Sequence, residues 1–163
     1  MSAAPPNDVP RGAFWLFAYG SLMWRPDFPF TTKRVARLHG YHRALCIQSW
    51  TYRGSPSTPG VVFGLDRGGA VNGIVYRIGA ADAAVVYAQV MAREMVSNVY
   101  RPVWASCQLP SSVSSSVPAL AFVADRQNPQ YAGRLGDDAA LKLIRQGHGQ
   151  GGACLDYVLN TQR

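Results

Sequence analysis

Runs of apolar, β-branched and aromatic residues alternate along the chain with short segments rich in glycine and proline. Such runs predict β-strands, because glycine and proline interrupt regular structure and favour turns. Six strands are predicted, near residues 14–19, 38–50, 61–65, 72–78, 100–109 and 119–124. The serine-rich stretch at 111–117 predicts a loop between the last two strands.

Two other segments are predicted to be helices, residues 81–95 and 137–146. In the second, Asp137 is a candidate N-cap and Gly147 a candidate stop. A third, short helix is predicted to begin near Ala153. The strands come in a run with few helices between them. This order favours an α+β fold, with a mixed or antiparallel sheet and helices packed on it, over a doubly wound parallel sheet.

The composition is that of a folded domain. The chain has 163 residues, of which 48% are hydrophobic and 15% charged, so it suits one domain and is too apolar for disorder. We expect residues 1–12, which carry three prolines, to form a flexible tail and residues 13–163 to form a single domain. The N-terminus lacks a secretory pattern, and no apolar run reaches the roughly 18 residues of a membrane helix, so no membrane partner is expected.

Cysteines and charges narrow the function classes further. The three cysteines lie far apart, and no Cys or His spacing matches a zinc site. This predicts no metal and a reducing compartment, by default the cytoplasm. The net charge of +7 comes mostly from 14 arginines, which are scattered along the chain. A nucleic-acid-binding arm would cluster them, so no nucleic-acid partner is expected, whereas a positive field favours an anionic small-molecule substrate.

Glu94 is the only glutamate in the chain, and it ends the apolar face of the first predicted helix. The residues seven, four and three positions before it share that face and are Tyr87, Val90 and Met91. Burial on such a face should raise the pKa of the carboxyl group, which makes Glu94 a candidate general base. The alternative is a structural role in which Glu94 is buried and pairs with Arg93, Arg101 or another arginine.

Two turns are candidate ligand-binding segments. Residues 19–22 (YGSL) follow the first predicted strand directly, and a Gly-Ser turn there exposes backbone N–H groups that can hold a carboxylate or an oxyanion. The loop 53–60 contains two prolines and two glycines, and Arg53 at its head can reach a carboxylate with its fork of donors. Both segments also fit a structural interpretation, as a strand-end turn and a hairpin connection.

Two further patterns are rejected as chemical sites. Residues 147–152 spell GxGxxG, but a dinucleotide fingerprint follows a strand and opens a helix. Here the motif follows a predicted helix, so we interpret it as a helix-capping loop that can line a cleft. His42 and Cys46 share a face of one predicted strand, but they are about 13 Å apart, beyond hydrogen-bond reach.

Taken in order, these segments resemble the ChaC family of γ-glutamylcyclotransferases over residues 14–161, nearly the whole chain. The motifs that carry the resemblance are FAYGSLMW (17–24), RGSPSTPG (53–60), VNGIVYRI (71–78), AREM (92–95) with VYRPVW (99–104), FVADRQNPQYAGRL (122–135), and IRQGHGQGG (144–152) with DYVLNT (156–161). The resemblance implies a γ-glutamylcyclotransferase-like fold, a small mixed or antiparallel β-barrel with packed helices, and no cofactor.

The resemblance also implies a reaction. Members of the family cleave a γ-glutamyl amide by attack of the substrate's own α-amino group on its γ-carbonyl, which yields 5-oxoproline and, from glutathione, Cys-Gly. In this chain it implies Glu94 as the catalytic acid/base. The implied substrate-binding residues are Phe17, Ala18, Tyr19, Gly20, Ser21, Leu22, Arg53, Gly54, Tyr100 and Tyr131. The alternatives are a cyclotransferase for other γ-glutamyl amines or peptides and a non-catalytic regulatory binding protein.

Overall fold

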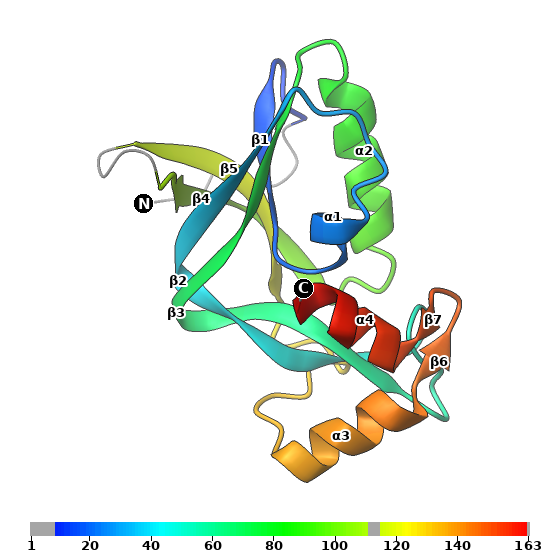
Figure 1. The fold of residues 1–163 in the computed structure, drawn as a ribbon. Helices are drawn as coiled ribbons and strands as arrows, with labels where there is room; N and C mark the ends of the chain where they lie inside the picture. Colours follow the sequence, from blue (N-terminus) through cyan, green and yellow to red (C-terminus); the bar gives the residue numbers. More distant parts are fainter. Residues whose placement is uncertain (1–8, 111–114, 163) are drawn as a thin grey trace.

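A closed five-stranded barrel forms the body of the computed structural model, which describes residues 9–110 and 115–162 (Figure 1). The strands are β1 (Phe14–Ala18), β2 (Thr32–Ser49), β3 (Gly60–Ile78), β4 (Tyr100–Gln108) and β5 (Ser116–Ala124). They are ordered β1-β3-β2-β4-β5, and every pairing is antiparallel except β1 with β5, which is parallel and closes the barrel. The expected α+β fold with a small mixed barrel is therefore confirmed.

Two of the predicted strands are one strand in the structure. The segments predicted at 61–65 and 72–78 belong to β3, which continues through Gly68 and Gly69 with φ of +102° and +72°. These glycines bend the strand instead of ending it, because only glycine adopts this conformation without a Cβ clash. Strand β2 begins at Thr32, earlier than predicted. The prediction missed its first residues because most of them are exposed, several are charged, and they lack a strand-like apolar pattern.

Four helices and a small hairpin complete the described chain: α1 (Ser21–Trp24), α2 (Ala83–Glu94), α3 (Asp137–Gln146), α4 (Cys154–Gln162), and β6 (His148–Gly149) with β7 (Gly152–Ala153). Helix α3 has the predicted bounds and ends at Gly147, but its N-cap is Gly136 and not Asp137. Helix α4 is the predicted third helix, whereas α1 was not predicted. None of the described helices is long and apolar enough to cross a membrane.

Parts of two predictions lie outside the described residues. Of the predicted tail 1–12, residues 1–8 are not described, and residues 9–12 have no helix or strand. Of the predicted loop 111–117, residues 111–114 are not described. Ser116 and Val117, at its other end, belong to β5, so the loop prediction is too long by two residues.

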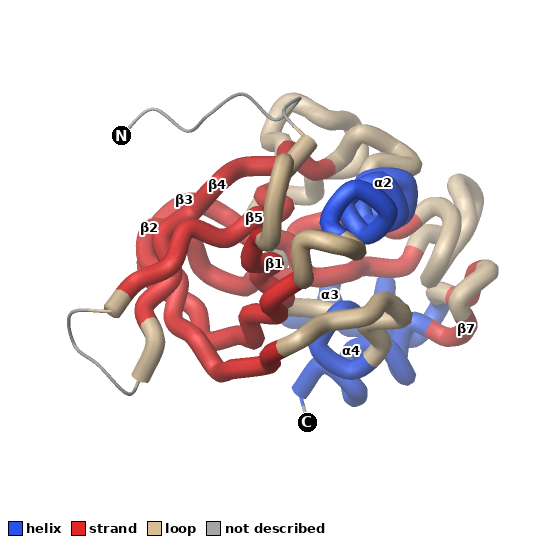
Figure 2. Tube along the Cα trace, turned by 90° about the horizontal axis from the view of Figure 1, so that it is seen from above, coloured by secondary structure: helices blue, strands red, loops and turns tan. Residues whose placement is uncertain are grey.

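Helix α2 packs its apolar face on the barrel and so fixes the position of Glu94. Its residues Val86, Tyr87 and Val90 are buried in a core cluster with side chains from β1, β3 and β5. In the view of Figure 2, α2 and α4 both lie to one side of the barrel strands. The C-terminal end of α2 thus lines one cavity together with the 19–22 turn after β1 and Tyr157 of α4.

Candidate active site

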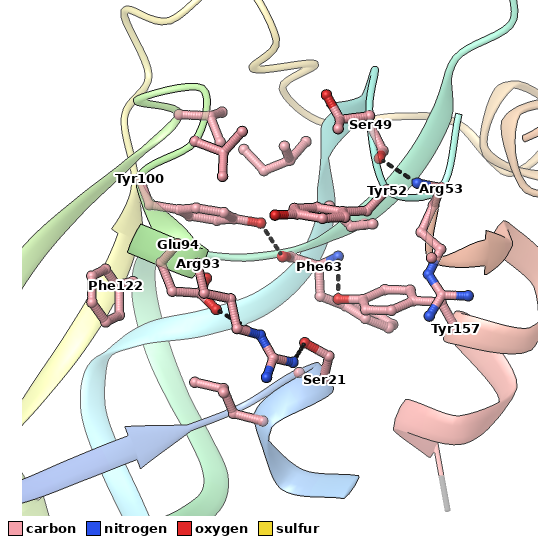
Figure 3. A pocket seen from close by; sticks show the side chains of 18 of the residues that line it. Ser21, Ser49, Tyr52, Arg53, Phe63, Arg93, Glu94, Tyr100, Phe122 and Tyr157 are labelled. Atoms are coloured by element: carbon pink, nitrogen blue, oxygen red, sulfur yellow. Dashed lines mark hydrogen bonds and ion pairs between the residues drawn. The ribbon is translucent and has the colours of Figure 1, made fainter. Parts of the chain in front are cut away.

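A cavity of about 480 Å³ lies where the barrel meets α1, α2 and α4 (Figure 3). Its walls come from the 19–22 turn, the end of β2, the 50–53 loop, the start of β3, the end of α2, the start of β4, and α4. The size is that of typical small-molecule pockets. Glu94 lines this cavity together with Tyr19, Arg53 and Tyr100.

Burial sets the acidity of Glu94. Its side chain is 16% exposed, and desolvation raises the pKa of the carboxyl group to about 7, against a smaller lowering effect of Arg93. The Arg93 Nε atom lies 3.9 Å from Glu94 Oε1, and no other cation of the described residues comes within 4.0 Å. The predicted shift of a carboxyl on an apolar helix face is confirmed, and the group can both accept and donate a proton near neutral pH.

Arg93 is held mainly by the turn after β1 and only loosely by Glu94. Its guanidinium donates to Ser21 Oγ at 3.0 Å and to the Arg25 carbonyl oxygen at 2.9 Å. The alternative partner Arg101 is exposed on β4 and forms no ion pair with Glu94. The carboxylate of Glu94 is therefore not locked in a short structural ion pair.

The 19–22 turn is held by a hydrogen bond from Arg43 and lines the cavity. The Tyr19 carbonyl oxygen accepts a 2.7 Å bond from Arg43 Nε, whose guanidinium also donates to the Asn72 carbonyl oxygen. A Cβ at Gly20 would lie 3.1 Å from Tyr157 Oη, so the glycine lets the phenol approach the turn closely. The N–H groups that open a helix such as α1 lack intrahelical acceptors and suit an anion.

Three phenols line the cavity with Glu94, of which Tyr19 and Tyr157 are buried and Tyr100 is half-buried. Tyr100 Oη donates to the Phe63 carbonyl oxygen at 3.1 Å, and Tyr157 Oη accepts from the Phe63 N–H at 3.1 Å (Figure 3). Desolvation raises the pKa of Tyr19, Tyr100 and Tyr157, and the Glu94 charge raises all three further. The phenols therefore stay neutral near pH 7, and they can act as hydrogen-bond donors.

Arg53 forms the wall of the cavity beside Tyr157. Its backbone N–H donates to Ser49 Oγ at 2.9 Å, its Nη1 donates to the Ala153 carbonyl oxygen at 3.0 Å, and its guanidinium lies 5.5 Å from the Tyr157 ring centroid. Burial lowers the pKa of the guanidinium from its usual value. Gly54 lies behind this wall, where an added Cβ would collide with Ser49 O and Gly60 N.

The structure brings most of the implied site residues to one cavity. The residues that line it with Glu94 are Phe17, Tyr19, Gly20, Ser21, Leu22, Arg53 and Tyr100. Ala18, Gly54 and Tyr131 are not part of its lining. Tyr131 instead donates its hydroxyl proton to Asp66 Oδ2 at 2.7 Å, and Asp66 also accepts from Arg126 at 2.8 Å.

The rejected GxGxxG stretch serves backbone packing. It follows α3, as predicted, and pairs with the 51–53 loop: Gln150 N–H donates to Thr51 O at 3.0 Å and Gly151 N–H donates to Tyr52 O at 2.7 Å. A Cβ at Gly149 would collide with Thr51 O. The glycines therefore allow two loops to touch, and Gln150 and Gly151 line the cavity, as the sequence allowed.

The other rejected pair is not a site either. His42 is exposed and its Nδ1 lies 3.0 Å from the Gly68 carbonyl oxygen, whereas Cys46 is buried at a register shift of β2. Among the described residues, no group of three or more His, Cys, Asp or Glu could hold a metal ion.

Among the cavity residues that the sequence did not identify as site residues, Tyr157 and Arg93 carry polar groups that the proposed chemistry uses. Tyr157 lies 63 positions after Glu94 on another helix, so no local spacing connects them. Arg93 was considered only as a partner for Glu94, because its contact with Ser21 depends on how α2 packs against the turn. The DYVLNT motif, which contains Tyr157, was the one signal that pointed toward this part of the chain.

Known proteins resemble this chain in sequence and in structure. The chain is 32% identical over 153 residues to the glutathione-specific γ-glutamylcyclotransferase of Escherichia coli, covering 94% of this chain and 65% of the relative. It is 33% identical over 157 residues to the human glutathione-specific γ-glutamylcyclotransferase 1, covering 95% of this chain and 71% of the relative. This chain thus spans slightly less than two thirds of the Escherichia coli protein.

A solved structure shares the fold. The crystal structure of a γ-glutamyl cyclotransferase specific to glutathione from yeast superposes with a TM-score of 0.82 at 21% identity, covering 93% of this chain and 86% of that one. The family model of ChaC-like proteins matches residues 14–163. With this match over the barrel, the 19–22 turn and the helix that carries Glu94, the chain belongs to the ChaC-like protein family.

Proposed function

We propose that this protein is a γ-glutamylcyclotransferase that cleaves glutathione into 5-oxoproline and Cys-Gly. The observation that carries the proposal is the position of Glu94, a carboxyl group with a pKa raised to about 7 that lines a cavity beside the 19–22 turn. The relatives named above as glutathione-specific γ-glutamylcyclotransferases support the choice of substrate.

The proposed reaction is an internal transfer. Glu94 takes a proton from the substrate's α-ammonium group, and the freed amine attacks the γ-carbonyl carbon to form a five-membered tetrahedral intermediate. Glu94 gives this proton to the leaving nitrogen as the amide C–N bond breaks and the lactam carbonyl re-forms. The ring nitrogen then loses its second proton to Glu94, which passes it to the freed amine, so that Cys-Gly leaves as an ammonium group and Glu94 is again a carboxylate. A carboxyl with a pKa close to the working pH suits these steps, because it exchanges protons readily in either direction. No water and no second reactant is consumed.

The rest of the cavity supplies binding and orientation. We propose that the 19–22 turn and Arg93 hold the α-carboxylate of the γ-glutamyl group. We also propose that the neutral phenol of Tyr157, which accepts from the Phe63 N–H and keeps its own proton, donates to the carbonyl oxygen as it gains negative charge. Holding the amine close to the γ-carbonyl removes much of the entropic cost of ring closure. Phe17 and Leu22 add apolar wall to the same space.

Three further proposals concern the domain, the compartment and the size of the substrate. We propose that residues 13–163 act as one domain, since the barrel strands and α4 contribute side chains to the same cavity. We also propose the cytoplasm as the compartment, since Cys46, Cys107 and Cys154 are all free and buried. The substrate is a small molecule, for which the cavity has the appropriate size.

The test is the identity of the product. Purified protein is incubated with glutathione, with γ-Glu-Ala and with N-acetyl-glutathione, and the products are identified by mass spectrometry. We expect 5-oxoproline and Cys-Gly from glutathione and no reaction of the N-acetylated peptide, because its nitrogen cannot attack. Turnover of γ-Glu-Ala alone would point to another γ-glutamyl substrate. Free glutamate would mean hydrolysis, and binding without turnover would indicate a regulatory binding protein.

A further inference from the structure

Arg53 presents a buried positive charge that forms no ion pair within the described chain, although the Asp156 charge on α4 acts on it from farther away. The residue is 8% exposed, and no Asp or Glu oxygen of the described residues lies within 4.0 Å of its guanidinium. Its only side-chain hydrogen bond among them is the one from Nη1 to Ala153 O. Buried charges are costly unless they are paired, and a guanidinium has five N–H donors to satisfy. The cavity wall therefore offers a fixed cation with spare donors.

The surroundings hold this guanidinium in place without an acid. It lies 6.0 Å from the Trp24 ring centroid and 5.5 Å from that of Tyr157. Behind it, the 147–152 loop is bonded to the 51–53 loop through Gln150 and Gly151. Such a preorganised fork matches the geometry of a carboxylate, which it binds with two parallel N–H···O bonds.

Arg53 and Glu94 stand at different ends of the cavity. Tyr157 stands between them in Figure 3, and its ring centroid lies 5.5 Å from the Arg53 guanidinium. Neither Glu94 nor Arg53 shifts the pKa of the other. Figure 3 shows the same order, with Glu94 and Arg93 on one side and Arg53 beyond Tyr157 on the other.

The substrate proposed above carries two carboxylates, one at each end of the molecule. The α-amino and α-carboxylate groups share one carbon atom, so an amine at Glu94 places the α-carboxylate near Arg93 and the Ser21 turn. The carboxylate of the leaving Cys-Gly lies on the far side of the γ-carbonyl. An arginine that held the α-carboxylate would have to stand beside Glu94, which Arg53 does not.

We propose that Arg53 binds the terminal carboxylate of the leaving peptide. The enzyme would then act on γ-glutamyl peptides with a free C-terminus and discriminate against γ-glutamyl amines and esters. This inference rests on the proposed cyclotransferase function and adds to it a basis for substrate choice. The affinity gained from the carboxylate comes from a charge-assisted pair with a buried guanidinium.

The experiment compares glutathione with its glycine monoethyl ester, which keeps the reacting atoms and loses only the terminal charge. For wild-type protein we expect kcat/KM for glutathione to exceed that for the ester by about 10- to 100-fold. In Arg53→Gln this ratio should fall close to one. The matched control is Arg34→Gln, which removes an exposed arginine of β2 that does not line the cavity and should keep the wild-type ratio.

Two outcomes would overturn the inference. Equal use of both substrates by the wild-type protein would do so without any variant, whether or not Arg53→Gln folds. An equal loss on both substrates in a folded Arg53→Gln protein, with the ratio kept, would assign Arg53 to the γ-glutamyl group or to structure.

The failure of the proposed function is a separate result. If wild-type protein forms no 5-oxoproline, the same two compounds are compared by calorimetric titration. Tighter binding of glutathione than of the ester, lost in Arg53→Gln, supports the carboxylate site even though the cyclotransferase proposal fails. Equal binding, or no binding of either compound, overturns the inference as well.

Discussion

Glu94 owes its chemistry to its position at the end of a buried helix face. The apolar residues before it bind α2 to the barrel, and this packing removes water from the carboxyl group. Arg93 compensates only in part, because its donors are used by Ser21 and the Arg25 carbonyl oxygen. A loose ion pair and strong desolvation together keep the carboxyl close to half-protonated near pH 7.

Replacement of Glu94 by glutamine tests its role in catalysis. Glu94→Gln keeps the size of the side chain and removes its ability to exchange a proton, so kcat should fall by about 10² to 10⁴. The measurement is 5-oxoproline formation under saturating glutathione, with circular dichroism as the control for an unchanged fold. Retention of more than about a tenth of the activity would show that another group moves the proton.

The same substitution should affect stability in a pH-dependent way. The folded-state pKa of Glu94 is raised to about 7 from its ordinary value of 4.5, so the folded protein binds more protons than the unfolded chain between these values. Stability is therefore lost as pH rises through this window, by up to about 3 kcal/mol at pH 8. Since Gln cannot ionise, Glu94→Gln should be more stable than wild type at pH 8.

Urea denaturation at two pH values measures this difference. The advantage of Glu94→Gln should shrink to under about 1 kcal/mol at pH 5, where the wild-type carboxyl is largely protonated in the folded state. An advantage of the same size at both pH values would mean that polarity or shape, and not ionisation of Glu94, causes it.

Tyr131 is the implied site residue that the structure connects to a different group. Its hydroxyl donates to Asp66 Oδ2 at 2.7 Å, and Asp66 is nearly buried. Tyr131→Phe should lower the free energy of unfolding by about 1 kcal/mol. It should change kcat/KM for glutathione less than twofold, because the side chain does not line the cavity. A higher KM or a lower kcat without a loss of stability would instead indicate that Tyr131 contacts the substrate.

At the scale of elements, the site depends on loops that pack backbone against backbone. The 51–53 loop lies between the end of β2 and the start of β3, and the 147–152 segment after α3 lies directly on it. Glycines make this contact, since at Gly147 and Gly149 an added Cβ would collide with backbone atoms of the 51–53 loop. Arg53 is positioned by this contact.

Gly149→Ala should push the two loops apart. The overpacking should cost about 1–3 kcal/mol of stability and raise KM for glutathione through displacement of Arg53. Gly12→Ala is the matched control, because a Cβ there meets no atom within 4 Å. Thermal denaturation and steady-state kinetics of both variants give the comparison. If Gly149→Ala behaves like Gly12→Ala, the loop contact does not hold the site.

At the scale of the whole molecule, the charge balance favours anionic ligands. The chain carries a net charge of +7, and glutathione carries a net charge of −1 at neutral pH. Long-range attraction should raise the rate of encounter and the affinity. The described arginines that produce this field lie on barrel strands, helices and loops, in agreement with the absence of a sequence cluster.

Salt should therefore lower kcat/KM for glutathione. Raising NaCl from about 10 mM to about 500 mM shortens the Debye length from roughly 30 Å to a few ångström, and kcat/KM should fall several-fold. The glycine monoethyl ester, which has no net charge, serves as the control and should respond less. A similar fall for both substrates would mean that salt acts on the protein and not on the encounter.

The sequence by itself determined what depends on local periodicity and on turn residues. The apolar face of α2, the bounds of α3, most of the strands, and the raised pKa of Glu94 all follow from spacings within a few residues of each other. The YGSL turn and the Arg53 loop were identified in the same way, by their position directly after or between strands.

Only the tertiary structure decided how these pieces meet. The closure of the barrel by the parallel pairing of β1 with β5, the continuity of β3 through Gly68 and Gly69, and the approach of Tyr157 to Gly20 all join distant parts of the chain or a bent backbone. Local patterns do not encode such contacts, because their energy appears only when both partners have been brought together by the packing of the barrel. For the same reason, only the tertiary structure decides that Arg53 is buried without an ion pair, because this depends on where the acidic residues of distant segments lie.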